Sequence, residues 1–196
     1  MDDFYDLRNP LISDSEIIKF VLAGDREQYA ELVRRHQAHV LSLCRGLLLN
    51  PTLAEDAAQD IFVKVFKILE QFKNRSLFST WLFRIATNHC LDVKRNLRRL
   101  PTESLENLSP LNKISVQNTS PGIEKRFEMR DFAAYLLKDL SEAEHATLVL
   151  KEGEGLSYEE ISGVLDISID AVKSRLKRAR EKIEEKARHF LRVQNV

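Results

Sequence analysis

Four copies of a short helix-start pattern constrain this sequence more than any other feature. In each copy a serine or threonine stands three positions before a glutamate, at Ser13–Glu16, Thr52–Glu55, Ser141–Glu144 and Ser157–Glu160. In such a capping box the hydroxyl and the carboxylate satisfy free backbone N–H groups at the start of a helix. We therefore expect a helix to begin at each point, and we expect Gly24 and the pair Asn50-Pro51 to end the helices before them.

Apolar residues recur after these starts at steps of three and four, which is the spacing of one helix face. Three stripes show it: Tyr29, Leu32, Val33, His36, Val40, Leu43, Cys44 and Leu47; then Ala58, Ile61, Phe62, Val65, Phe66 and Leu69; then Trp81, Leu82, Ile85 and Ala86. The sequence has no sustained alternation typical of a strand. We therefore predict an all-α fold in which these helices pack as a compact bundle.

The helical pattern lapses between Leu100 and Gly122, a stretch that contains three prolines among Ser, Asn and Thr. This composition predicts a flexible linker. Fully extended, the linker would reach roughly 70–80 Å, at about 3.3–3.6 Å per residue. Two small helical domains are thus expected, formed by residues 1–99 and residues 123–196.

Charge is balanced in total but uneven along the chain. Lysine plus arginine and aspartate plus glutamate number 30 each, and the net charge is zero. Acids crowd residues 2–31 and 139–160, whereas bases crowd residues 94–99 and 173–182. Clustered cations bind DNA phosphates through counterion release, so each basic cluster is either a DNA-binding surface or a solvated helix face.

The cysteines and the chain start indicate the compartment. Cys44 and Cys90 lie in apolar helical patterns, and we interpret them as buried small hydrophobic residues in a reducing cytosol. The acidic residues 1–6 are not followed by the apolar stretch of a secretory signal. Apolar runs stay well short of the roughly 18 residues that cross a bilayer. We expect a cytoplasmic protein that does not insert into membranes.

Two short helices joined by a tight turn are predicted near the C-terminus. The first is Ser157–Leu165 and the second, strongly basic helix begins at Ile169, as in a helix-turn-helix. Five apolar residues of the second helix share one face: Ile169, Val172, Leu176, Ala179 and Ile183. Ser174 lies opposite that face with Lys177 and Arg178 beside it, an arrangement that suits base edges and phosphates. Docking to an acidic protein or a membrane surface remains an alternative use.

A segment from Phe72 to Arg95 mixes aromatic, small polar and basic residues. This chemistry suits unstacked single-stranded bases, because aromatic rings stack on them and amides bond their edges. Trp81 and Phe83 are more simply explained as core residues. Asn88 is a poor helix former that needs exposure or a polar partner, which makes it the stronger candidate for a contact.

These residues together resemble a known family. The run AEDAAQDIFVKVF from Ala54, followed by FSTWLFRIATN ending at Asn88, is similar to region two of extracytoplasmic-function sigma factors of bacterial RNA polymerase. The run LSYEEISGVLDIS from Leu156, followed by AVKSRLKRAR ending at Arg180, is similar to their region four. The resemblance extends from about residue 13 to residue 188.

The resemblance implies a protein with no catalytic activity, cofactor, metal or small-molecule substrate. Its implied partners are core RNA polymerase, promoter DNA in duplex and single-stranded form, and an anti-sigma factor that covers both domains. The implied minus-ten contacts are Lys73, Arg75, Phe78, Ser79, Thr80, Arg84, Asn88, Lys94 and Arg95. Asn88 would line a pocket for a flipped base. The implied minus-thirty-five contacts are Lys173, Ser174, Arg175, Lys177 and Arg178.

The implied polymerase-docking surface lies on the helix that begins near Ala54. Its polar and exposed members are expected to be Asp56, Gln59, Asp60, Val63 and Lys64. Phe62 and Phe66 are expected to be core residues instead.

Two other classes of protein are weighed against this one. An autonomous helix-turn-helix regulator would usually dimerise and would leave the aromatic-basic segment without a role. A metal-dependent enzyme or sensor would have to use His36, His39 and Cys44, or His89 with Cys90. Cys44 does not share a helix face with His39, and no Cys-x-x-Cys pair is present, so a metal site is not favoured.

Overall fold

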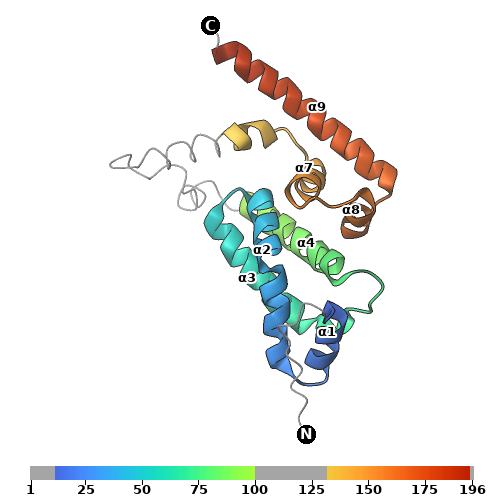
Figure 1. Cartoon of the computed structure of the whole chain (residues 1–196). Coiled ribbons are helices and arrows are strands. Elements are labelled where there is room, and N and C mark those ends of the chain that lie inside the picture. The colour runs from blue at the N-terminus through green and yellow to red at the C-terminus, as the bar shows by residue number, and fades with distance from the viewer. Residues whose placement is uncertain (1–11, 100–131, 195–196) are drawn as a thin grey trace, which may run out of the picture.

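The computed structural model describes residues 12–99 and 132–194, and within these ranges every regular element is a helix. The N-terminal half contains α1 (Asp14–Leu22), α2 (Tyr29–Leu48), α3 (Pro51–Lys67) and α4 (Phe78–Arg99), with short 3₁₀ turns at Arg26–Gln28 and Leu69–Gln71. The C-terminal half contains a helix at 132–137, then α7 (Glu142–Leu148), the π-helical turn η4 (Val149–Gly153), α8 (Tyr158–Leu165) and α9 (Ile169–Gln194) (Figure 1). The all-α expectation is confirmed for the described ranges, and the expected linker lies outside them.

Three of the four expected capping boxes form. Ser13, Ser141 and Ser157 each accept a hydrogen bond from the glutamate N–H three residues on. The fourth prediction, at Thr52, is wrong, because α3 begins two residues earlier. There the side chain of Asn50 accepts a hydrogen bond from the N–H of Leu53, and Pro51 takes the first helical position, where its missing N–H has no cost. Helix α1 ends at Leu22 as expected, and Gly24 follows with φ 110°.

The N-terminal half is a bundle in which α2, α3 and α4 share a core. The largest fully buried side chains there include Leu32, Leu43, Leu47, Ile61 and Leu82. Cys44 and Cys90 are 0 % exposed, with their sulfur atoms 3.5 Å apart and no disulfide, which confirms that they fill the core. Trp81 packs against the rings of Phe72 and Phe78, so the expectation of a scaffold role for Trp81 also holds.

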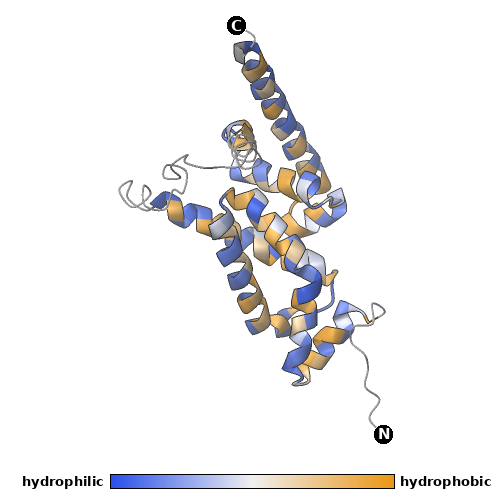
Figure 2. Ribbon diagram, turned by 60° about the vertical axis from the view of Figure 1, so that its left-hand side comes forward, coloured by the Kyte–Doolittle hydropathy of each residue, from blue (hydrophilic) through white to orange (hydrophobic). Residues whose placement is uncertain are grey.

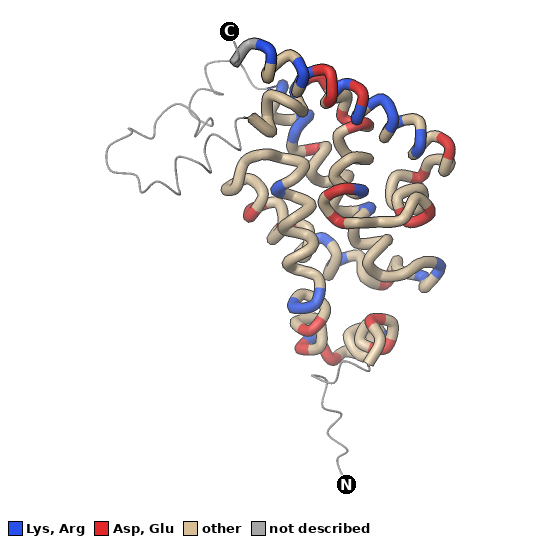
Figure 3. Tube along the Cα trace, turned by 45° about the horizontal axis from the view of Figure 1, so that its top comes forward, with Lys and Arg blue, Asp and Glu red and all other residues tan. Residues whose placement is uncertain are grey.

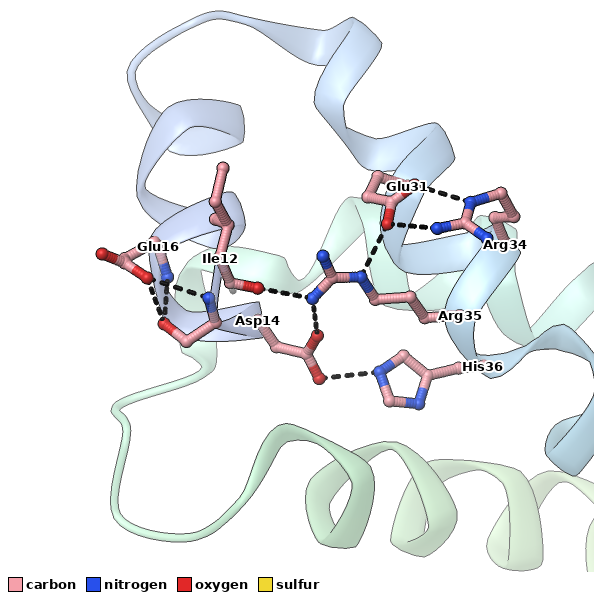
Figure 4. Close-up of polar contacts among 8 residues, drawn as sticks. Ile12, Asp14, Glu16, Glu31, Arg34, Arg35 and His36 are labelled. Atoms are coloured by element: carbon pink, nitrogen blue, oxygen red, sulfur yellow. Dashed lines mark hydrogen bonds and ion pairs between the residues drawn. The ribbon is translucent and has the colours of Figure 1, made fainter. Parts of the chain in front are cut away.

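A polar network holds α1 against α2 (Figure 4). The carboxylate of Asp14 is 2.7 Å from Nε2 of His36 and 3.2 Å from Nη1 of Arg35. Arg35 also donates to the carbonyl of Ile12 at 2.7 Å and to Glu31 at 2.7 Å. The hydrogen bond from His36 lowers the pKa of Asp14. The start of the described chain is thereby fixed to the bundle.

The C-terminal half has the expected helix-turn-helix. Asp166 ends α8 in the left-handed conformation, with φ 55°. Ser168 starts the next helix, because its hydroxyl accepts a hydrogen bond from the N–H of Ala171 at 3.2 Å. The residues buried between the helices are Leu150, Ile161, Val164, Val172, Leu176 and Ala179. The helices carry both hydrophobic and hydrophilic residues in Figure 2, as amphipathic helices do.

The two halves pack on each other. Their buried apolar residues, from Ile17 in α1 to Leu176 in α9, belong to one continuous cluster. Helix α8 lies beside α4, and η4 lies beside α2 (Figure 1). Among the helices of the described ranges, none combines the length and the apolar character needed to span a bilayer.

Candidate nucleic-acid interface

The outward face of α9 carries the residues expected to contact the upstream promoter element. Lys173, Ser174, Lys177 and Arg178 are exposed, whereas Val172, Leu176 and Ala179 face the core. The Lys177 side chain is 77 % exposed. Arg175 is half-buried at the edge of the face. Figure 3 shows that Lys and Arg follow one another along this helix with Asp and Glu interspersed.

Arg178 forms an ion pair with Glu144. The sequence indicated only a helix-capping role for Glu144. The Glu144 side chain is 6 % exposed. Its carboxylate lies 3.3 Å from Nε of Arg178 and 2.7 Å from Nζ of Lys182, and it also accepts the backbone N–H of Ser141. The hydrogen bond from Lys182 lowers the pKa of Glu144 to about 2. The carboxylate is therefore ionised and holds two cations of α9 to α7.

Helix α4 presents a row of residues at steps of four. Thr80, Arg84 and Asn88 follow this spacing and so share one face of the helix. Arg84 and Asn88 are exposed, and Thr80 is half-buried. Thr87, next to Asn88, is buried. The next residue in this row is the exposed Asp92, whose carboxylate lies 3.2 Å from Nη1 of Arg95. The face therefore offers hydroxyl, amide and guanidinium groups, with one carboxylate at its end.

Two residues expected to contact minus-ten DNA are placed differently. Phe78 is only 3 % exposed. Its ring packs against Phe72, Trp81 and the imidazole of His36, so it belongs to the core and is not presented for stacking on a base. Lys94 is half-buried, with Nζ 3.2 Å from Nδ1 of His145.

The loop before α4 carries exposed side chains. Lys73 and Arg75 are exposed as expected, and Ser79 is half-buried. Asn74 between them has φ 53° and accepts a hydrogen bond from the hydroxyl of Ser15 at 2.9 Å, which ties the loop to α1. The sequence analysis missed Leu77, an exposed apolar side chain in this loop. Leu77 belongs to none of the apolar helical stripes in the sequence, and this could have identified it as an exposed residue.

The outer face of α3 is exposed where polymerase docking is expected. Asp56, Gln59, Asp60, Val63 and Lys64 are all exposed, at spacings that place them on adjoining rows of one helix. Val63 is 54 % exposed, an apolar residue in the middle of a polar face. Phe62 is buried as expected. The expectation for Phe66 is wrong, because it is 37 % exposed, with its ring packed edge-on against Tyr29.

The candidate metal ligands are dispersed. His36 is bonded to Asp14, whereas His39 faces Glu154 at 3.2 Å. Within residues 12–99 and 132–194, no group of three or more His, Cys, Asp and Glu side chains is arranged to hold a metal ion.

Comparison with known proteins agrees with this geometry. Residues 32–100 match the family Sigma-70 region 2, and residues 134–183 match Sigma-70, region 4. The ECF RNA polymerase sigma-E factor of Escherichia coli K12 is 29 % identical over 187 residues, which cover 92 % of this chain and 97 % of that protein. The RNA polymerase sigma-H factor of Pseudomonas aeruginosa is 30 % identical over 185 residues, covering 91 % and 96 %.

Solved structures give the same result. CnrH in complex with the cytosolic domain of CnrY matches with a TM-score of 0.65 and 26 % identity, over 88 % of this chain and 95 % of that one. The sigma factor RpoE in complex with the anti-sigma factor NepR from Bartonella quintana shares the fold, with a TM-score of 0.62 and 22 % identity over 83 % and 98 % of the two chains.

The fold and the family matches together indicate a helical transcription factor. Its N-terminal bundle is region two and its C-terminal helix-turn-helix is region four. The chain belongs to the extracytoplasmic-function sigma factors of RNA polymerase, and its function is that of a sigma factor in transcription initiation. These matches give no support to an autonomous helix-turn-helix regulator.

Proposed function

We propose that this sigma factor directs core RNA polymerase to promoters by reading two elements with two separate surfaces. The observation that carries the proposal is the pair of outward faces, one on α9 with Ser174, Lys177 and Arg178, and one on α4 with Arg84 and Asn88. Each face stands on a helix whose opposite side is fixed in the core. A rigid base of this kind holds contacting side chains in place for recognition.

The α9 face is proposed to enter the major groove at the minus-thirty-five element. Lys177 and Arg178 provide donors for guanine edges, and Lys173 and Ser174 provide donors for phosphates. Arg175, half-buried at the edge, is proposed to contact the backbone only. Glu144 limits the freedom of Arg178, so its guanidinium loses less entropy when it binds.

The α4 face is proposed to hold the minus-ten element as single-stranded DNA. Asn88 has both a donor and an acceptor in its amide, which suits the Watson–Crick edge of a flipped base. Arg84 and Arg95 are proposed to contact the backbone. Lys73, Arg75, Ser79 and Thr80 are proposed to close the pocket from the loop and the first turn of α4.

The α3 face is proposed to dock on core polymerase. Val63 supplies an exposed apolar contact within a polar face, and interfaces of this kind combine an apolar centre with a polar rim. Phe66 extends this apolar contact, in a role that the sequence analysis did not give it. The protein would act by binding alone, without catalysis of its own, in the cytoplasm where polymerase works.

We also infer that an anti-sigma factor holds this chain inactive. Support comes from the solved relatives, whose structures contain CnrY and NepR as bound partners. Such a partner would have to cover surfaces in both halves to prevent polymerase docking and DNA binding together.

Run-off transcription with purified core polymerase tests the proposal. We expect transcripts from the chain's own promoter only when the chain is added, and we expect Val63→Glu to abolish binding to core polymerase. Glu70→Lys, a charge change at another exposed position beyond α3, is the matched control and should bind normally. Transcription that is equal with and without the chain would contradict the proposal.

A further inference from the structure

An acidic residue lies among the cations on the outward face of α9. Asp170 is exposed, and its side chain is 94 % accessible to solvent. Ser174, Lys177 and Arg178 follow it after four, seven and eight residues, a spacing that places all four on one side of a helix. The proposed minus-thirty-five surface therefore carries a carboxylate at its N-terminal end.

Helix capping does not account for this aspartate. The hydroxyl of Ser168 accepts the N–H of Ala171, and the carbonyl of Ser168 accepts the N–H of Val172. Ser168 thus acts as the N-cap, and Asp170 lies inside the first turn. A carboxylate in the first turn gains from the helix dipole on any side of the helix, so the dipole does not explain why Asp170 lies on the outward face.

The contact between Asp170 and Lys173 is loose. Nζ of Lys173 lies 3.7 Å from Oδ1 of Asp170, which is longer than an ordinary N–H···O hydrogen bond. Exposed ion pairs of this kind contribute little to stability and are screened by salt. The carboxylate is therefore available to a ligand that approaches this face of α9.

A carboxylate in the major groove discriminates between bases because most groups there repel it. Phosphate oxygens are anionic, guanine presents the acceptors N7 and O6, and thymine presents the acceptor O4 and a methyl group. Adenine presents the donor N6, but its acceptor N7 lies beside that donor and repels the second carboxylate oxygen. Cytosine presents the amine N4 without an acceptor on the same base edge, so it is the base that suits a carboxylate best.

We propose that Asp170 determines part of the promoter specificity, with one carboxylate oxygen accepting a hydrogen bond from N4 of a cytosine in the minus-thirty-five element. The inference rests on the proposed function of α9 and adds a base that its cations cannot select. Asp170 precedes Lys177 by seven residues, or about 10 Å along the helix axis. The cytosine is therefore expected within about three base pairs of the base contacts of Lys177, at roughly 3.4 Å for each base pair.

The same carboxylate should weaken binding to DNA that lacks this cytosine. Without the amine, the anion lies beside acceptors or phosphates and loses bound water without gaining a hydrogen bond. Removal of its charge should raise the affinity for unrelated duplexes and lower the discrimination between bases. Loss of a cation that contacts phosphate has a different result, because it weakens binding to every sequence.

Asp170→Asn tests the base choice with a side chain of nearly the same shape. An asparagine amide both donates and accepts, and it pairs with N6 and N7 of adenine. This variant should exchange cytosine for adenine at one position of the element. Asp170→Ala should have no preference at that position, and Asp170→Glu should retain cytosine because it retains the carboxylate. Ser168 still caps the helix in each variant, so α9 should remain folded.

Glu185→Gln is the matched control. It removes the same charge from an exposed position of the same helix, fifteen residues after Asp170, or about 22 Å along the axis. That separation exceeds the Debye length, which is about 8 Å at physiological salt. We expect the base preferences of Glu185→Gln to equal those of the wild type.

Selection of promoter duplexes by the holoenzyme measures the base preference. Duplexes with a randomised minus-thirty-five region are bound by core polymerase with the full-length wild type, with each variant or with Lys177→Ala, and the bound duplexes are sequenced. We expect the wild type to prefer cytosine at one position by at least about five-fold, the lower end of the range for a base contact. Asp170→Asn should select adenine at that position and should bind unselected duplexes more tightly than the wild type.

The outcomes distinguish the cytosine contact from the proposed role of α9. Identical base preferences for Asp170→Asn and Glu185→Gln, in a region where Lys177→Ala does change the selection, would overturn the cytosine contact and leave α9 as the recognition surface. A wild type that selects no sequence in the minus-thirty-five region would instead contradict the proposed function of α9, and the cytosine contact with it.

Discussion

The imidazole of His145 lies 3.2 Å from the ammonium of Lys94, across the boundary between the two halves. His145 is 4 % exposed. Burial, together with the charge of Lys94, lowers its pKa to about 4. Burial also lowers the pKa of Lys94, with a contribution from the nearby Arg98. The closed chain therefore keeps His145 neutral, whereas an open chain would expose it.

This burial predicts that acid opens the chain. The ordinary histidine pKa is about 6.5, so between that value and pH 4 the open form takes up a proton that the closed form excludes. The closed form is favoured fully above pH 6.5 and loses this advantage as pH falls. We expect the radius of gyration from small-angle scattering to rise between pH 7 and pH 5.

His39 must be removed for a clean test of that prediction. It is a second histidine at the boundary between the halves, with Nδ1 3.2 Å from the Glu154 carboxylate. The experiment therefore uses a His39→Gln background and compares it with the same chain carrying His145→Gln. An unchanged pH profile after the second substitution would show that His145 is not responsible.

Glu144→Gln is predicted to destabilise the C-terminal half and to loosen Arg178. Glutamine keeps the hydrogen bond of the capping box but loses the charge that faces Arg178 and Lys182. Both cations are substantially exposed, so solvent limits the loss to about 1 kcal/mol of unfolding free energy. Urea unfolding measures it. Glu159→Gln, at an exposed position in the first turn of α8, is the control and should cost less than about 0.5 kcal/mol.

Asn88→Ala is predicted to impair promoter opening while leaving polymerase binding intact. The substitution removes a paired donor and acceptor, and a lost bidentate base contact costs about 1–3 kcal/mol of discrimination. Permanganate footprinting of the melted region measures opening, and gel filtration with core polymerase measures binding. Asn96→Ala, at another exposed asparagine of α4, serves as the control. Normal melting by Asn88→Ala would remove Asn88 from the proposed pocket.

Lys177→Ala is predicted to weaken recognition of the upstream element by about 1–3 kcal/mol. Its side chain points away from the core, so the fold should be unaffected. Footprints over the minus-thirty-five element at physiological salt measure the effect. Lys138→Ala, an exposed lysine in the turn before α7, is the control. If the two variants protect that element equally, the outward face of α9 is not the recognition surface.

Local signals in the sequence predicted most of the fold. Capping boxes at Ser13, Ser141 and Ser157 located helix starts because each depends only on a hydroxyl and a carboxylate three residues apart. The prediction failed at Thr52 because Asn50, an equally good cap, precedes a proline that is already set for the first helical turn. Helical periodicity likewise predicted which residues of α9 face outward.

The contacts between the halves could not be predicted in the same way. From the sequence alone, Gly46 and Gly163 are simply residues that destabilise a helix. Each allows a close approach to a residue far away along the chain, Val149 for Gly46 and Thr80 for Gly163. The predictions for Phe78 and Phe66 were wrong for a related reason, since Phe78 is buried and Phe66 is partly exposed. Periodicity assigns a helix face, but it does not say how far a neighbouring loop or helix covers the end of that face.

Transcription from a pool of random promoters with core polymerase tests the two-surface account most directly, when the wild type is compared with Asn88→Ala and Lys177→Ala. The account predicts that wild-type transcripts come from templates with two sequence blocks at a fixed spacing. Asn88→Ala should alter the base preference of the downstream block alone, and Lys177→Ala that of the upstream block alone. Templates that keep both blocks unchanged with both variants, or that change in the same block with each, would contradict it.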